Sequence, residues 1–340
     1  MSLDLNTTWF FLVGVLLAGY AVLDGFDLGV GALHLWVKKD RDRRVLLNAI
    51  GPVWDGNEVW LVTGGGALFA AFPLVYSTVF SGFYHAFMLL LWMLIFRAVA
   101  IEFRSKRQER WWRRMWDTSF AVGSVGASLL VGVALGNVAR GIPLGPDQAY
   151  AGGFLALLNP YALMVGITTV ALFTMHGCIY LILKTEDTLQ ELVLGWVRKT
   201  IIAFLLCYGC TTAVTLLTLP HMTVAFRAHP ALLVIPLASA LAIANIPREV
   251  HRQRYMRAFL SSCAAVVALL ALFGVGMYPN MVYSLPNPER SLDIYNAASS
   301  SKTLGIMLTI AALGVPMVLT YTAGIYWVFR GKVQLDEDSY

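Results

Sequence analysis

Apolar runs long enough to cross a lipid bilayer recur along nearly all of the 340 residues. A membrane-spanning helix needs about 20 predominantly apolar residues. Short polar loops separate the runs, so the pattern predicts an all-α membrane protein with nine transmembrane helices. The predicted spans are 9–37, 51–73, 77–101, 119–139, 160–184, 200–219, 230–247, 258–279 and 304–329. The span 230–247 is the weakest of them, because it is short and contains Pro236.

Basic residues gather in alternate loops. The loops near 38–50, 103–117, 185–198 and 248–257, with their flanks and the carboxy-terminal tail, hold 20 of the 25 Lys and Arg residues. Because cytoplasmic loops are enriched in Lys and Arg, this split places the N-terminus outside and the C-terminus in the cytoplasm. Opposite ends for the two termini require an odd number of spans. The opposite side carries only Arg140, Arg227, Arg290 and Lys302.

Composition agrees with a membrane protein and excludes an ordinary soluble domain, because 58% of residues are hydrophobic and 13% are charged. The net charge of +5 comes from the topology loops, so it gives no reason to expect nucleic-acid binding. The first residues have no basic segment or cleavage site, so we interpret the first span as a retained helix. The four cysteines are predicted to be small buried residues. A redox or metal site is the alternative for Cys207 and Cys210, which have CxxC spacing.

Four acidic residues lie where a bilayer disfavours them. Asp24 and Asp27 belong to the first predicted span, and Asp55 and Glu58 to the second. A carboxylate in hydrocarbon costs several kcal/mol, so such residues usually face protein or a water-filled path. The members of each pair are three residues apart and share a helix face. Two interpretations stay open: a cytoplasmic proton path, or structural roles as caps and buried hydrogen-bonded groups.

Other polar residues within the spans also have two interpretations. Arg97 either extends its side chain to the membrane surface or pairs with Glu102 or an acid of the second span. His85 and His176 are the only histidines near mid-membrane. Two bis-histidine hemes would need four, so satisfied interior histidines are favoured over a heme site. Gly25 and Gly29 form a GxxxG unit, a weak signal for close helix contact.

Six strings stand out along the chain: Asp24-Gly-Phe-Asp-Leu-Gly29, Pro52-Val-Trp-Asp-Gly-Asn-Glu-Val-Trp60, Gly65-Gly-Ala-Leu-Phe-Ala-Ala-Phe-Pro73, Phe96-Arg-Ala-Val-Ala-Ile-Glu-Phe-Arg104, Gly132-Val-Ala-Leu-Gly-Asn137 and Leu158-Asn-Pro-Tyr161. These strings resemble subunit II of cytochrome bd-type quinol oxidases, including the cyanide-insensitive branch. Length and topology agree over nearly the whole chain, although the specific motifs lie mostly in the amino-terminal third.

The resemblance implies two four-helix bundles and a ninth, peripheral helix. The corresponding regions are 1–140, 141–280 and 281–340. It also implies that Asp27 and Asp55 line a cytoplasmic proton path, with Asp24 and Glu58 as further candidates. Some relatives have Gln at the position of Glu58. Trp60 matches a residue near the proposed oxygen route, and we expect Trp60, Gly25 and Gly29 to contact subunit I.

The expected function is that of a non-heme accessory subunit of a terminal quinol:oxygen oxidoreductase, inactive alone, in the bacterial or archaeal cytoplasmic membrane. The resemblance places hemes b and d, or b only, in the partner subunit I, and no heme or metal in this chain. Some members hold a structural quinone, but no motif here locates one. Membrane lipids and small single-helix subunits are further expected partners. The alternatives are a proton-coupled secondary transporter, which would favour discontinuous helices in matching halves, and a purely structural subunit.

Overall fold

The computed structural model describes residues 4–335, and these form an all-α protein with one small β-hairpin. The α-helices and strands are α1 (Leu5–Leu33), α2 (Asp40–Ile50), α3 (Trp54–Ala71), α4 (Pro73–Gly82), α5 (Tyr84–Phe103), α6 (Arg110–Arg140), α7 (Pro160–Lys184), α8 (Asp187–Thr218), α9 (Val224–Ala228), α10 (Val234–His251), α11 (Tyr255–Met277), α12 (Ser301–Val328), β1 (Asn280–Val282) and β2 (Leu292–Asp293). Short 3₁₀ turns are η1 (His34–Trp36), η2 (Arg104–Lys106), η3 (Phe154–Leu158), η4 (Pro220–Thr223), η5 (Pro230–Leu233) and η6 (Pro288–Arg290).

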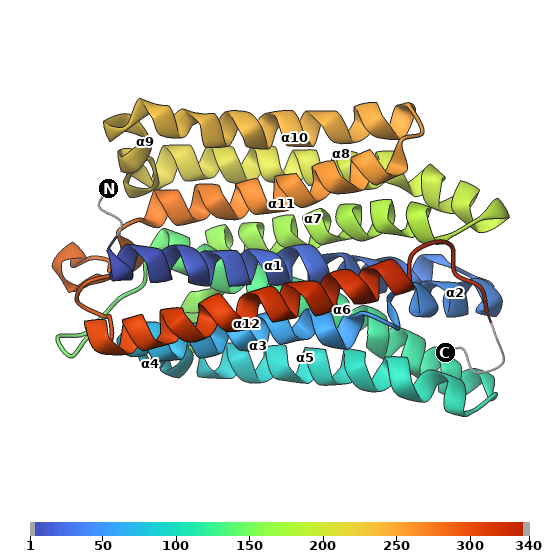
Figure 1. The fold of residues 1–340 in the computed structure, drawn as a ribbon, viewed down its shortest axis with the longest axis horizontal. Helices are drawn as coiled ribbons and strands as arrows, with labels where there is room; N and C mark the ends of the chain where they lie inside the picture. Colours follow the sequence, from blue (N-terminus) through green and yellow to red (C-terminus); the bar gives the residue numbers. More distant parts are fainter. Residues whose placement is uncertain (1–3, 336–340) are drawn as a thin grey trace.

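The long helices run side by side along the longest axis of the molecule (Figure 1). Helix α1 is central and packs against α3, α6, α7 and α11. The loops that are rich in basic residues gather at one end of the bundle, where α2 also lies (Figure 1). We call this the basic end of the bundle. Helix α1 begins at the opposite end, whereas α12 finishes at the basic end, so α12 arrives beside the start of α3.

Eight of the described helices are long and apolar enough to cross a membrane. They overlap all of the predicted spans except the second, and the third begins at Tyr84 because residues 77–82 belong to α4. That span corresponds to α3, which is only 18 residues long and carries Asp55, Asn57 and Glu58 in its first turns. The break at Phe72 and Pro73 then separates α3 from α4. The protein is therefore a multi-pass membrane protein, whereas the count of nine spans remains a prediction.

Two segments differ from the pattern expected from hydropathy, and a third, weakly predicted span agrees with it. The predicted loop 38–50 contains α2, whose Leu46, Leu47 and Ile50 are buried beneath a charged outer face. Helix α8 begins at Asp187, well before the predicted start at residue 200, because its first turns carry polar residues outside the most apolar stretch. The weak span 230–247 does form a helix, because Pro236 falls in the first turn of α10, where its missing N–H is tolerated.

The connections between predicted spans at residues 140–159 and 280–303 fold together at the end opposite the basic end. Strands β1 and β2 pair there in antiparallel fashion, and Ile142 bridges to Ser284. Buried Val282 and Leu292 anchor this cap in an apolar cluster with the first turns of α1. At that end α1 begins after Asp4, whose carboxylate accepts a hydrogen bond from the Thr7 amide at 2.7 Å. This bond lowers the pKa of Asp4.

The residues after α12 bind back to the basic end of α7. The Lys332 ammonium donates to the carbonyl oxygens of Ile182 at 2.9 Å and Thr185 at 2.6 Å. These acceptors lie in the last turn of α7 and just beyond it, where helix carbonyl groups lack intrahelical partners. Desolvation lowers the pKa of Lys332. Helix α12 fully buries only Leu304, so these hydrogen bonds add to the partial packing of Ile325 and Tyr326 at its far end.

Candidate functional site

A buried cluster of charged side chains joins α1, α3 and α5. Asp24 and Asp27 lie on the inner face of α1, Glu58 on α3 and Arg97 on α5. Asp24, Asp27 and Arg97 are completely buried, while Glu58 is partly exposed. We call these four residues the Arg97 cluster. It brings together three of the four acids that the sequence singled out.

The Arg97 guanidinium holds the carboxylates unequally. Its Nη2 donates to Asp24 Oδ1 at 2.6 Å, and its Nη1 donates to Glu58 Oε1. The nearest approach to Asp27 is longer, at 3.8 Å from Nη2 to Oδ2. Of the two open interpretations of Arg97, pairing with an acid of the second span is therefore confirmed, and Asp24 is an additional partner. Asp27 is the carboxyl group that Arg97 holds least.

Asn57 connects Asp27 to two further helices. Its Nδ2 donates to Asp27 Oδ2 at 2.7 Å and to the Leu23 carbonyl at 3.2 Å. Its Oδ1 accepts from the hydroxyl of Tyr326 on α12 at 2.9 Å. Sequence reasoning missed both residues. An amide between Asp55 and Glu58 in an apolar span was a usable signal for Asn57, whereas nothing local marked Tyr326, 269 positions away.

Several atoms of the cluster have no hydrogen-bond partner among the described residues. They include Asp27 Oδ1 and Asp24 Oδ2, both buried. Buried polar atoms are usually satisfied by protein or by ordered water. These oxygens are therefore the places in the cluster where a water molecule or a transferable proton would bind.

Asp55 lies apart from this network even though it shares a helix with Glu58. Its side chain is exposed on the surface of α3, whereas Asn57 and Glu58 turn inward. Trp60, further along α3, is partly exposed and packs its ring over Gly19 of α1. The structure therefore divides the predicted acids into a buried group and one surface carboxylate.

Gly25 and Gly29 lie at a close crossing of α1 with α7 of the same chain. A Cβ atom added at Gly29 would be 1.8 Å from the Phe173 carbonyl oxygen, and one at Gly177 would be 2.6 Å from the Gly29 carbonyl carbon. Glycine on both helices is what permits this approach. The GxxxG unit therefore forms a helix contact inside this chain. Contact of Gly25 and Gly29 with subunit I stays a prediction, and their burial against α7 argues against it.

A second ionic cluster, which sequence reasoning missed, lies at the basic end. Asp117 of α6 accepts from Arg104 Nε at 2.6 Å and from Arg43 Nη1 at 2.7 Å. Its Oδ1 also lies 2.5 Å from His34 Nε2. Arg104 continues to Asp40 through a 2.7 Å bond. We call these residues the Asp117 cluster; it ties α1, α2, α5 and α6 together. An aspartate just before an apolar span was the one local signal for it.

The histidines and cysteines take separate places. His176 is buried between the Ser262 hydroxyl at 2.7 Å and the Val22 carbonyl at 3.0 Å, as expected of a satisfied interior histidine. His85 is instead exposed, beside Phe154. Among residues 4–335, no three His, Cys, Asp or Glu side chains are grouped to hold a metal ion.

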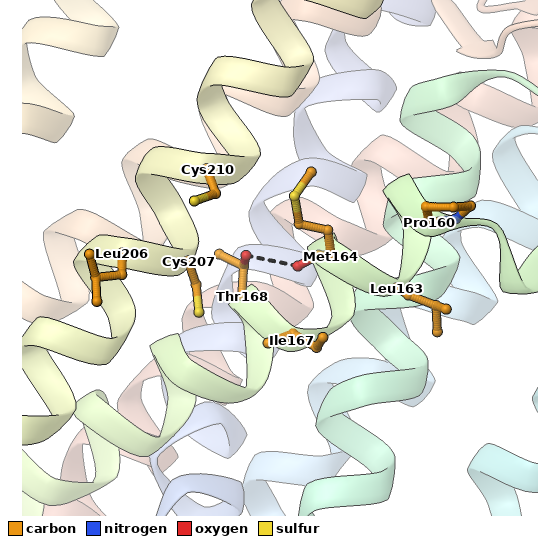
Figure 2. A pocket seen from close by; sticks show the side chains of 8 residues that line it. All are labelled: Pro160, Leu163, Met164, Ile167, Thr168, Leu206, Cys207 and Cys210. Atoms are coloured by element: carbon orange, nitrogen blue, oxygen red, sulfur yellow. Dashed lines mark hydrogen bonds between the residues drawn. The ribbon is translucent and has the colours of Figure 1, made fainter.

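The paired cysteines face a shallow apolar groove of about 310 Å³ between α7 and α8 (Figure 2). All four cysteines are free. The prediction of burial holds for Cys178 but is wrong for Cys210, which is exposed on the outer face of α8. Thr168 lines the groove and donates its hydroxyl to the Met164 carbonyl at 2.8 Å (Figure 2). Nothing polar in the groove is left to bind a ligand specifically.

The fold and the Arg97 cluster define a multi-pass helical membrane protein with a largely buried ionic site among its helices. Residues 5–329 match the family described as cytochrome bd terminal oxidase subunit II. The chain is similar to cytochrome bd-I ubiquinol oxidase subunit 2 of Escherichia coli, at 35% identity over 98% of this chain and 96% of that protein. It is 32% identical to cytochrome bd ubiquinol oxidase subunit 2 of Bacillus subtilis, covering 98% of each chain.

A chain in the solved structure of bd oxidase from Geobacillus thermodenitrificans shares the fold, with a TM-score of 0.79 and 16% identity, over 96% of this chain and 98% of that one. The protein therefore belongs to the cytochrome bd terminal oxidase subunit II family. By that membership it is a subunit of a terminal oxidoreductase.

Proposed function

We propose that this chain is the non-heme accessory subunit of a bd-type quinol:oxygen oxidoreductase in a bacterial or archaeal cytoplasmic membrane. It supports a heme-bearing subunit I, which holds hemes b and d or b only, and it is not catalytic alone. Support comes from the family and from the nearly complete coverage of relatives that are themselves named as subunit 2 of ubiquinol oxidases.

The Arg97 cluster is the observation that carries a role in proton delivery. Three carboxyl groups surround one guanidinium, so the fully ionised cluster would hold a net charge of two negative units. A buried net charge is costly, so the cluster is best balanced when a carboxyl group binds a proton. Asp27 suits this role because Arg97 holds it least and its Oδ1 has no partner among the described residues.

The proposed path runs from the exposed Asp55 through Glu58 to Asp27, with Asp24 fixing Arg97. The Asp55 side chain is exposed in this chain, although it lies in an apolar helix. A carboxylate at membrane depth needs water or protein against it. We therefore assign the exposed side of α3, with Asp55 and Trp60, as the surface that faces subunit I.

The proposed division into two four-helix bundles, over 1–140 and 141–280, agrees with the placement of the Arg97 cluster in the first of them. The third region, 281–340, contributes α12, whose Tyr326 donates to Asn57 beside the cluster. Under this proposal the amino-terminal bundle performs the proton transfer, and the second bundle buttresses it through the close contact of α1 with α7.

Asp27→Asn tests the path, because it keeps the shape and hydrogen-bonding capacity but removes the titratable proton. We expect oxygen consumption by the intact complex to fall roughly 100-fold, the usual scale of lost acid–base function. Heme content and heme reduction by quinol should stay normal. The measurements are oxygen uptake and heme absorbance on the same purified complex.

The matched control is Asp147→Asn, which changes an exposed aspartate at the opposite end of the bundle. It should leave all three readouts unchanged. A fully active Asp27→Asn complex would rule out the path and leave a structural role. A parallel loss of heme content and oxygen uptake would instead show that Asp27 is needed for assembly.

A further inference from the structure

A large polar pocket opens at the basic end, outside the Arg97 cluster. Its volume is about 670 Å³, and α1, α2 and α6 with their connections supply its lining. Five basic side chains and two acidic ones line it, so the lining has a net charge of three positive units. The basic residues are Lys38, Arg43, Arg110, Arg113 and Arg114.

The two acids of the pocket are already neutralised inside the Asp117 cluster. Asp117 accepts from Arg43 and Arg104, and Asp40 accepts from Arg104 and Arg113. The other three basic side chains have no hydrogen bond or ion pair to any part of the chain between residues 4 and 335. They are Lys38, Arg110 and Arg114. Since the acids are satisfied, these three groups leave the pocket with an uncompensated positive field, which selects an anion.

The side chains are also arranged to converge. Arg110, Arg113 and Arg114 lie three and four residues apart on α6, so they project from one helix face. Lys38 approaches from the connection that follows α1. Several guanidinium groups around one space match the geometry of a phosphate group, which accepts paired hydrogen bonds.

The rim of the pocket distinguishes a lipid from a soluble anion. Leu35 is exposed and belongs to the lining, and Trp111 and Met115 expose apolar side chains next to Arg110 and Arg114 on α6. Tryptophan is enriched where a protein crosses the membrane surface. An inorganic anion would gain nothing from this rim, whereas acyl chains would pack against it. Basic pockets at helix ends are suited to anionic headgroups.

We propose that this pocket binds the phosphate headgroup of an anionic diacyl phospholipid, with the acyl chains lying along the apolar rim. The site is independent of the proposed proton path, because it shares no residue with the Arg97 cluster. It would fix one lipid between the connection after α1 and the start of α6.

The test compares lipid binding by the purified oxidase complex and by an Arg110→Gln/Arg114→Gln double variant. The two arginines are exposed and have no partner in the described chain, so the variant should remain folded. Native mass spectrometry would measure binding of dioleoylphosphatidylglycerol, dioleoylphosphatidylcholine and inorganic phosphate. The matched control is Arg252→Gln/Arg254→Gln, which removes two exposed charges from another loop at the same end.

We expect one phosphatidylglycerol to bind in preference to phosphatidylcholine. Loss of each charge should weaken binding about fivefold, so the double variant should bind at least about 10-fold less tightly and the control should not change. Equal binding by the double variant, or equal binding of the two lipids, would overturn the proposal.

Two further outcomes would also overturn it, by assigning another occupant. Displacement of the lipid by millimolar inorganic phosphate would identify a free-phosphate site. Phosphatidylglycerol binding that is absent from the intact complex and appears only after deletion of residues 336–340 would identify the acidic tail Asp336-Glu-Asp338 as the occupant. Unchanged lipid binding in both experiments would support the lipid site.

Discussion

Arg97 sets the charge balance of the buried site at the scale of single residues. It is completely buried on α5, and it donates to Asp24 of α1 and to Glu58 of α3. Removing one partner of a buried ion pair is more costly than the pair itself is stabilising, because it leaves an uncompensated charge. The residue therefore serves the fold as well as the proposed path.

We expect Arg97→Gln to destabilise the chain by about 3–5 kcal/mol, because Asp24 and Glu58 would lose their counter-charge. The yield of monodisperse protein and its thermal unfolding midpoint in detergent would measure this loss. The control is Arg252→Gln, at an exposed position of the basic end, and it should change neither the yield nor the unfolding midpoint.

The triple variant Arg97→Gln/Asp24→Asn/Glu58→Gln removes the stranded charges as well. Most of the lost stability should return, because the three substituted groups are neutral and similar in shape and Asp27 can bind a proton. A triple variant as unstable as the single one would show that Arg97 stabilises the fold by packing and not by charge.

At the scale of helices, the contact between α1 and α7 determines where the acids of α1 point. Gly29 and Gly177 bring the two backbones together, and Phe173 packs over Gly25. This contact holds the opposite face of α1, with Asp24, toward α5. The close approach of α1 and α7, which the glycines permit, therefore helps to set the position of the Arg97 cluster.

Gly29→Ala should destabilise the protein, because the new Cβ would collide with backbone atoms of α7 that cannot rotate away. Overpacking of this kind costs about 1–3 kcal/mol or more. Gly14→Ala, on the same helix with open space around it, is the matched control and should be neutral or slightly stabilising. Thermal unfolding of the two purified variants measures the difference, and equal midpoints would contradict the close crossing.

Sequence patterns predicted the elements better than they predicted their partners. Hydropathy found the long helices because lipid-facing segments must be apolar along their whole length. It missed α2, whose stabilising face is only a few residues wide. It also found Asp24, Asp27 and Glu58, because acids in apolar spans are conspicuous. Which of them meet Arg97 depended on helix packing, and the link from Asn57 to Tyr326 depended on the return of α12.

At the scale of the whole molecule, the distribution of charge gives the chain two unlike ends. The basic loops meet at the end that carries the Asp117 cluster and the anionic-lipid pocket, while the hairpin cap closes the other end (Figure 1). Asp55, near the start of α3, lies toward the basic end. A proton path that enters from the cytoplasm therefore requires the basic end to be cytoplasmic.

The orientation can be tested in intact cells with a membrane-impermeant thiol reagent. Gln108→Cys places a thiol at an exposed position of the basic end, and Asp147→Cys places one at the opposite end. Both changes belong in a Cys210→Ala background, since Cys210 is the exposed native thiol. Because basic loops are retained in the cytoplasm, only the thiol introduced at Asp147 should react from outside. Disrupting the membrane should make the thiol introduced at Gln108 reactive, which shows that it is accessible once the barrier is gone. Labelling from outside at Gln108 but not at Asp147 would show that the basic end faces outward. The proposed path through Asp55 could then not take protons from the cytoplasm.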